Sequence, residues 1–108
     1  MISFLIPTHN YAKFLSKSIL SLNKNSRKYI KEIIIVNDGS TDNTDYVIKN
    51  LKKKVRFKYY KKNFLSLSKS MNFAIKKSEG NILCKIDPDD FIEKDFAKKM
   101  GLKFKELK

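Results

Sequence analysis

Residues 32–41 read EIIIVNDGST, a continuous apolar run of strand length that ends in a turn signal. An unbroken apolar run, rather than alternation of apolar and polar residues, is typical of a strand buried on both faces of a parallel sheet. The residues Asn, Asp, Gly and Ser that follow favour a turn. We therefore expect a buried strand over residues 32–37 that opens into a polar loop at its carboxyl end.

The segments on either side of this strand alternate between strand and helix patterns. An apolar strand over residues 2–7 precedes it, and Leu15, Ile19 and Leu22 recur at helical spacing between the two. Further expected segments are a helix from about residue 44, a strand over 55–61, a helix ending near Gly80, a strand over 81–86 and a loosely helical tail over 91–108. The order β-α-β-α-β-α-β predicts an α/β fold, a mostly parallel sheet between two layers of helices.

Three of these segments carry more specific expectations. The strand over 55–61 alternates apolar and basic residues, which indicates a position nearer an edge of the sheet. Ser66 or Ser68 can cap the third helix, and its apolar stripe comprises Leu67, Met71, Ala74 and Ile75. The tail after residue 91 is rich in lysine, so we expect its end to fray.

The composition fits one small domain. The chain has 108 residues, of which 42% are apolar, enough for a folded core. No apolar run approaches the ~20 residues of a membrane span, and no signal-peptide pattern is visible, so we expect a cytoplasmic protein, either free or peripheral at the inner face of the membrane. Cys84 is the only cysteine, which excludes an internal disulfide, and its apolar surroundings favour a buried thiol.

The charge balance indicates a phosphate-bearing partner. The chain has 24 basic and 11 acidic residues and a net charge of +13, which implies attraction to nucleic acid, a nucleotide or an anionic membrane. The acidic residues are not interspersed but gather in two segments, 38–45 and 87–95. This grouping indicates a site, because a surface that only maintains solubility would mix both signs.

Polar side chains follow each of the four expected strands, at residues 7–10, 37–40, 61–63 and 87–90. Ligands of open α/β sheets bind beyond the carboxyl ends of the strands. Asp87, Asp89 and Asp90 are crowded into four positions, where like charges repel unless a cation compensates them. Mg²⁺ and Mn²⁺ prefer carboxylate oxygen, so the pattern indicates a candidate metal centre.

Four stretches together resemble the nucleotide-binding half of family 2 glycosyltransferases, an inverting group with the Rossmann-like GT-A fold. They are ISFLIPTHNYAKFLSKSILSL (2–22), EIIIVNDGSTDNT (32–44), NFLSLSKSMNFAIKKSEGNIL (63–83) and KIDPDD (85–90). Their order and spacing are similar to those of the family from residue 2 to about 92. The resemblance implies a GT-A domain that stops after the aspartate motif.

The resemblance implies roles for the matching residues. The end of the first strand and the pair after it, Pro7, Thr8, His9 and Asn10, would cradle the nucleoside. Asp38 would hydrogen-bond the base, and a carboxylate suits this role because N3 of uracil is a donor. The motif Asp87, Pro88 and Asp89 would contact the ribose and hold Mn²⁺ or Mg²⁺ against the diphosphate of a UDP-sugar. Asp87 and Asp89 are the expected metal ligands, Asp89 the principal one.

Two positions depart from the family or invite another interpretation. Many relatives carry an arginine where Met71 stands, facing the donor phosphates. Met71 lies on the apolar stripe, so we expect it in the core, with Lys69 or Lys62 as a substitute charge. His9 is the only histidine, and without a visible partner we expect a nucleotide contact there rather than a general base.

The resemblance also sets an expectation for domain organisation. Residues 1–92 would form the nucleotide-sugar-binding half, and residues 93–108 would begin an acceptor-binding half. Relatives carry their general base in that second half, and no residue here matches it. The expected acceptor is an unknown glycan or lipid-linked molecule. A sheet cut at this point would have an open edge and could self-associate.

A second class of function stays open from the residues alone. The run KKKVRFKYYKK (52–62) mixes basic and aromatic residues as nucleic-acid surfaces do. A non-catalytic basic module that binds nucleic acid or an anionic membrane surface is therefore the alternative. The strand alternation of the same run explains its aromatic residues as core and flank, so we expect no nucleic-acid partner.

Overall fold

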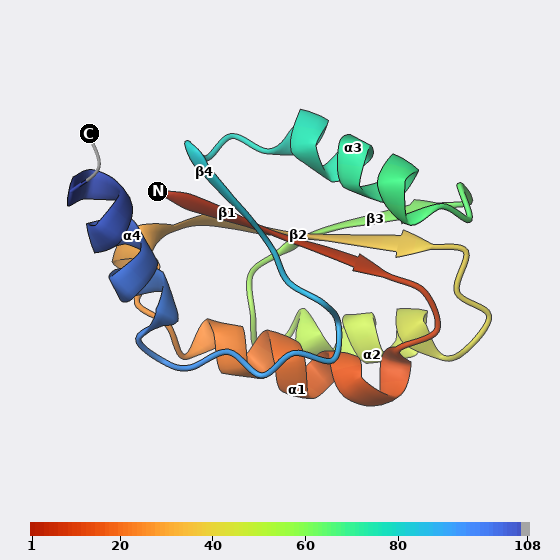
Figure 1. Ribbon diagram of the computed structural model, residues 1–108. Coiled ribbons are helices and arrows are strands. Elements are labelled where there is room, and N and C mark those ends of the chain that lie inside the picture. The colour runs from red at the N-terminus through yellow and green to blue at the C-terminus, as the bar shows by residue number, and fades with distance from the viewer. Residues whose placement is uncertain (107–108) are drawn as a thin grey trace.

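The computed structural model describes residues 1–106. Its elements follow the expected alternation (Figure 1). They are β1 (Ile2–Thr8), α1 (Ala12–Asn23), a short 3₁₀ helix η1 (Arg27–Tyr29), β2 (Ile30–Asp38), α2 (Thr44–Leu51), β3 (Lys58–Lys62), α3 (Leu67–Lys77), β4 (Ile82–Lys85) and α4 (Phe96–Glu106). The fraying expected at the end of the tail falls on residues 107–108, outside the described residues.

The sheet has four strands in the order β3-β2-β1-β4, and every neighbouring pair is parallel. The two central strands, β1 and β2, are buried almost throughout, which confirms the inference from their unbroken apolar runs. In Figure 1, α1 and α2 cover one face of the sheet and α3 covers the other. The three-layer α/β/α prediction is therefore confirmed.

The larger core cluster lies where α1, α2 and the chain after β4 pack against β1 and β2. Phe4, Ile6, Leu15 and Ile19 belong to this cluster, together with Ile33. A smaller cluster under α3 contains Leu5, Ile34, Val36 and Ala74, with Met71 packed against it. This position confirms the expectation that Met71 serves the core.

The tail packs onto the core instead of standing apart from it. The rings of Phe96 and Phe4 lie 6.2 Å apart, and Ala97 is fully buried. Asn25 fastens the segment from the end of α1, because its side chain donates to the Glu93 carbonyl at 3.0 Å and accepts from the Ala97 amide at 2.8 Å. Residues 92–97 thus belong to the fold that surrounds β1.

Three details differ from the sequence expectations. The strand predicted from residue 55 begins at Lys58, because Val55 instead caps the end of α2 with its amide bonded to the Leu51 carbonyl, and its side chain enters the core. On α3 the buried positions are Ser70 and Ala74, whereas Leu67 and Ile75 are exposed. Cys84 is only partly buried, since β4 is an edge strand.

Both edges of the sheet end in strands with exposed residues. The prediction that residues 55–61 lie near an edge is confirmed, because β3 forms one edge. β4 forms the other and alternates partly buried and exposed residues, with Leu83 exposed. Self-association through this edge stays a prediction. Among the described residues, no helix combines the length and apolar content needed to cross a bilayer.

Candidate functional site

A cavity of about 530 Å³ opens at the carboxyl edge of the sheet, between the end of β1, the start of α3 and the turn after β4. Seven residues that the sequence singled out line it: Pro7, Thr8, His9, Asp38, Asp87, Pro88 and Asp89. Six residues that the sequence did not indicate as site residues line it as well: Tyr11, Leu65, Ser66, Leu67, Ser70 and Lys85. Segments up to 82 residues apart in the chain thus meet in one cavity, because parallel strands bring their carboxyl ends to the same edge of the sheet.

Asp38 is 5% exposed and forms the floor of the junction between β2 and α3. Its Oδ1 accepts from the Leu65 amide at 2.7 Å, and its Oδ2 accepts from the Ser66 amide at 2.8 Å and the Ser70 hydroxyl at 2.9 Å. Burial alone would raise the pKa of Asp38, but these hydrogen bonds outweigh it and hold the pKa below its ordinary value. The Asp38 carboxylate is therefore held in its ionised form by the backbone of the loop that precedes α3 and by Ser70.

The loop that meets Asp38 has an uncommon backbone. Leu65 adopts a φ of 50°, which is rare for a residue with a side chain, and Gly39 on the facing loop adopts 66°. The left-handed backbone of Gly39 favours glycine, and a Cβ there would lie 2.7 Å from Leu65 Cδ2, so the Leu65 side chain would have to move. Strained backbone persists only where surrounding contacts hold it, and here the bonds to Asp38 do so.

Thr8 ends β1 inside the cavity and is 3% exposed. Among the described residues, its hydroxyl oxygen has no hydrogen-bond partner. A buried hydroxyl without a partner is unfavourable by roughly 1–3 kcal/mol, and the contact expected between Thr8 and a nucleoside stays a prediction. The other buried hydroxyl of this kind, on Ser18, lies in α1 and does not line the cavity.

His9 is positioned by the neighbouring loop. Its Nδ1 lies 2.6 Å from the backbone carbonyl of Asp38, and because a carbonyl only accepts, Nδ1 carries the proton and donates. Nε2 then accepts from the Asn10 side-chain amide at 3.3 Å. This arrangement leaves His9 as a wall of the cavity and provides no carboxylate that would activate it as a base.

Asn10 does not line the cavity but joins two loops. Its side-chain oxygen accepts from the amides of Thr41 and Asp42 at 2.7 and 3.2 Å, and its own amide donates to the Ser40 hydroxyl at 3.0 Å. Asp42 completes the link by accepting from the Ala12 amide, at the start of α1, at 3.0 Å. The contact expected between Asn10 and a nucleoside stays a prediction. In the fold, the Asn10 side chain stabilises the turn between β1 and α1.

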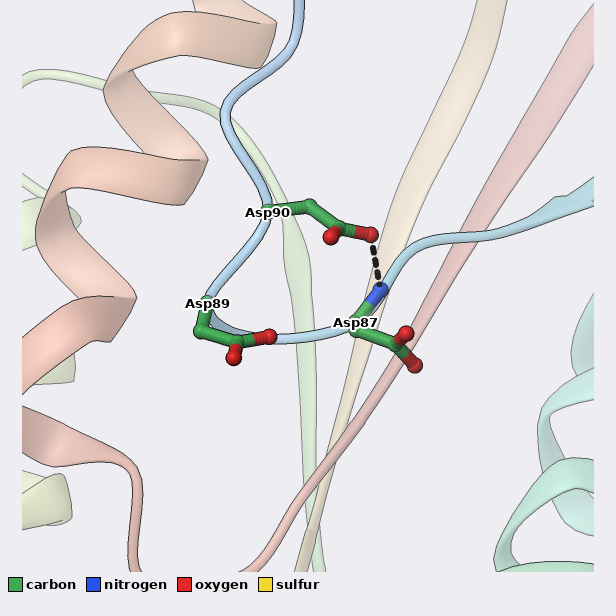
Figure 2. Close-up of side chains that lie close together, drawn as sticks. All are labelled: Asp87, Asp89 and Asp90. Atoms are coloured by element: carbon green, nitrogen blue, oxygen red, sulfur yellow. Dashed lines mark hydrogen bonds between the residues drawn. The ribbon is translucent and has the colours of Figure 1, made fainter.

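The aspartates after β4 form a compact acidic group. One carboxylate oxygen each from Asp87, Asp89 and Asp90 lies within 4.8 Å of the others, and all three side chains are exposed. Figure 2 shows Asp90 reaching back across the turn, where its Oδ2 accepts from the Asp87 amide at 3.0 Å. Asp90 therefore stabilises the turn. Figure 2 draws no hydrogen bond between the carboxylates of Asp87 and Asp89.

The donor set fits a hard divalent cation. Carboxylate oxygens that converge without intervening nitrogen or sulfur suit Mg²⁺ or Mn²⁺, and such ions commonly use one or two carboxylates together with substrate phosphates. Asp87 and Asp89 provide this number of carboxylates, and their role as metal ligands stays a prediction. A positively charged side chain already lies beside these carboxylates, because Lys85 Nζ is 3.1 Å from Asp87 Oδ1.

The two lysines proposed as substitute charges lie elsewhere. Lys62 Nζ stands 4.5 Å from the centre of the Phe73 ring, and neither Lys62 nor Lys69 is among the residues that line the cavity. Lys85 is there instead. The sequence contained a signal for Lys85, because it lies at the end of a strand, two residues before Asp87 of the aspartate motif. Ser70 and Leu65 had none, since their partner Asp38 is distant in sequence.

Fold and site together define a class of protein. A parallel α/β sheet with a polar cavity beyond its strand ends is typical of domains that bind a small, often phosphorylated, ligand. The sequence then identifies the family: residues 3–108 match Glycosyl transferase family 2, and the chain belongs to this family.

Individual relatives agree with the family. An uncharacterized glycosyltransferase of Rickettsia bellii is 34% identical over 105 residues, which cover 96% of this chain and 14% of that protein. The poly(ribitol-phosphate) beta-N-acetylglucosaminyltransferase TarS of Staphylococcus aureus is 31% identical over 99 residues, covering 89% of this chain and 17% of TarS. The chain therefore spans about one sixth of the length of these relatives.

Solved structures confirm the GT-A fold. The crystal structure of S. aureus TarS residues 1–349 with UDP-GlcNAc has a TM-score of 0.87 and 28% identity, covering 97% of this chain and 31% of that one. The mannosyltransferase PcManGT of Pyrobaculum calidifontis, solved with GDP-Man and Mn²⁺, has a TM-score of 0.83 at 18% identity, covering 93% of this chain and 31% of that one. The second likeness supports the fold alone.

Proposed function

We propose that this chain is the donor-binding region of an inverting glycosyltransferase and binds the nucleoside diphosphate of a UDP-sugar in the cavity at the carboxyl edge. One observation carries the proposal: a buried hydroxyl without a partner, on Thr8, lines the same cavity as a preformed carboxylate pair, Asp87 and Asp89. The relative TarS, which was solved with UDP-GlcNAc, supports a uridine nucleotide as the ligand.

In this proposal the nucleoside lies against β1. Pro7, Thr8 and His9 form its wall, and the Thr8 hydroxyl gains the hydrogen-bond partner that it lacks. Asp38 would accept a hydrogen bond from N3–H of uracil. Because the Leu65 and Ser66 amides and the Ser70 hydroxyl already hold both oxygens of Asp38, this acceptor is oriented before the ligand arrives.

Asp87 and Asp89 would hold Mn²⁺ or Mg²⁺ at the diphosphate. When bound, the ion would neutralise the negative charge that develops on the leaving nucleotide. The protein itself places two carboxylates close together at the rim of the cavity, and the Asp90 carboxylate stabilises the turn that carries them. Transfer to a glycan or lipid-linked acceptor would require a general base outside residues 1–92.

The binding proposal is tested by titrating UDP into the protein by calorimetry, with Mn²⁺ and with EDTA. We expect Mn²⁺-dependent binding in wild type, and in Asp89→Ala an affinity at least about tenfold lower because a metal ligand is lost. Asp95→Ala is the matched control, since it removes an exposed carboxylate outside the cavity. Equal affinity with and without the metal, unchanged in Asp89→Ala, would refute the assignment of Asp89.

Replacing Thr8 by valine separates a ligand contact from a structural one. Valine keeps the shape of the buried side chain and removes the unpartnered hydroxyl, so the free energy of unfolding should rise by about 1 kcal/mol while UDP affinity falls about fivefold. Thermal melts and UDP titration measure the two effects. Ser18→Ala should also be tolerated, but it should leave UDP affinity unchanged because Ser18 lies outside the cavity. A loss of UDP affinity shared by both variants would contradict the contact.

The alternative of a basic nucleic-acid module has no support in the structure described here. The aromatic residues of the run 52–62 are engaged: Phe57 and Tyr59 pack against the core, and Tyr60 packs against Phe73 in the smaller cluster. Stacking platforms for bases need exposed aromatic faces. Peripheral association with an anionic membrane stays a prediction that vesicle sedimentation would measure.

A further inference from the structure

Lys85 stands at the end of β4, where the strand delivers its side chain toward the cavity. Ile82 and Cys84 pack against the larger core cluster, so the alternate residues of the strand face the opposite side of the sheet. Lys85 pairs in register with Leu5, which belongs to the cluster under α3. Its side chain therefore lies on the α3 side, where the cavity opens.

Lys85 is the only lysine or arginine among the described residues that line this cavity. Its Nζ contacts Asp87 Oδ1 at 3.1 Å, and the two side chains are 39% and 56% exposed. An ion pair this exposed contributes little to stability and is easily exchanged, because water screens both charges. Lys85 can thus leave Asp87 when a stronger partner for either group is present.

The net charge at the turn after β4 changes as the cation and then the diphosphate bind. Asp87, Asp89 and Asp90 together with Lys85 leave a net charge of −2 at the turn, given three carboxylates and one ammonium group. A divalent cation would neutralise that charge and would also repel the neighbouring ammonium group. A diphosphate brought to the cation adds negative charge, which attracts the same ammonium group.

We propose that Lys85 exchanges partners during donor binding: it occupies Asp87 before the divalent cation arrives and then contacts the phosphate oxygens of the bound nucleotide. This inference rests on the proposed function and adds to it a residue that tunes the order of binding. It assigns to Lys85 the phosphate contact for which Lys69 or Lys62 was predicted and which Met71, packed in the core, cannot make. Lys85 is a positioning and binding residue in this scheme, and no proton or bond is transferred through it.

The exchange predicts effects of opposite sign when the charge is removed. In Lys85→Met, Mn²⁺ alone should bind about threefold to tenfold more tightly, because a competing and repelling cation is gone. UDP at saturating Mn²⁺ should bind about fivefold to tenfold more weakly, because a charge-assisted hydrogen bond to phosphate is lost. Lys85→Arg should restore UDP affinity to within about twofold, since it keeps the charge and the donors.

Calorimetry on the 108-residue chain measures both affinities, first with Mn²⁺ alone and then with UDP at saturating Mn²⁺. Lys76→Met is the matched control, an exposed lysine of α3 outside the cavity, and it should change neither affinity. Shifts of both affinities in the same direction in Lys85→Met, or no shift in either, would overturn the exchange. If wild type binds Mn²⁺ but not UDP, the proposed function and the phosphate contact fail together, and the Mn²⁺ titration still decides the competition at Asp87. If wild type binds neither, both proposals are refuted.

Discussion

Replacing Asp38 by alanine should lower the free energy of unfolding by about 3 kcal/mol, because three donors lose a charged acceptor at once. The Leu65 amide, the Ser66 amide and the Ser70 hydroxyl all bond to this carboxylate, and Leu65 holds a φ of 50° in the same loop. Without the hydrogen bonds to Asp38, no comparable interaction among the described residues offsets the unfavourable backbone conformation of Leu65 in the loop between β3 and α3. We therefore expect the cavity wall around Leu65 to loosen as the protein loses stability.

Urea unfolding followed by circular dichroism measures this loss. Ser70→Ala removes only one of the three donors and should lower the free energy of unfolding by about 1 kcal/mol, which gives a graded comparison. Asp95→Ala controls for the change in net charge. A stability of Asp38→Ala equal to that of Asp95→Ala would show that these bonds do not hold the loop.

The second large effect is a loss of stability at low pH that depends on Glu32. This carboxylate is 7% exposed near the amino end of the sheet, where it accepts from Lys58 Nζ at 2.8 Å and the Ser3 hydroxyl at 2.6 Å. Burial by itself would raise the pKa of Glu32, but the hydrogen bonds from Lys58, Ser3 and the Glu79 amide outweigh it and lower the pKa from 4.5 to about 2. The paired, ionised form is thus strongly favoured in the folded protein.

A carboxyl group with a folded-state pKa of about 2 and an ordinary value of 4.5 contributes roughly 3 kcal/mol to stability at neutral pH. Because the folded-state pKa is the lower one, this contribution is present above about pH 5 and is lost as the pH falls toward 2. Glu32→Gln should therefore be less stable than wild type by roughly 3 kcal/mol at pH 7, and the difference should shrink toward zero near pH 2.

Unfolding curves of both proteins at pH 7, 4 and 2.5 measure the dependence. Glu93→Gln is the matched control, since Glu93 and Lys99 are exposed and 3.7 Å apart, and it should change stability by less than about 0.5 kcal/mol at every pH. A Glu32→Gln difference that is the same at pH 7 and pH 2.5 would show that the ionised group is not what stabilises this end of the sheet.

Much of the fold was predictable because its strongest signals are local. The apolar runs at 2–7 and 32–37 belong to β1 and β2, and Ser66 caps the start of α3, as the sequence predicted. The start of β3 was not predictable. Val55 has strand-forming chemistry, yet it is used at the end of α2, where a bond to Leu51 and space in the core decide its place. Tertiary packing overrode local propensity at this position.

The composition of the site was predictable in part for the same reason. Thr8, Asp38, Asp87 and Asp89 lie directly at strand ends, and parallel topology brings strand ends to one edge. Tyr11 and Leu65 come from loops whose path depends on contacts with distant residues. Leu65 reaches the cavity because Asp38, 27 residues earlier, binds its amide. No periodic pattern in the sequence encodes such a contact.

The sequence by itself determined the alternating β/α order, the parallel sheet, the family and the strand ends at which the polar residues gather. Those properties follow from hydrophobic periodicity and turn chemistry, which act over a few residues. Only the tertiary structure decided which polar residues line the cavity and which of them support its walls. It showed Asn10 holding a loop, Met71 in the core and Lys85 at Asp87, because hydrogen bonds and ion pairs depend on distances between segments that folding brings together.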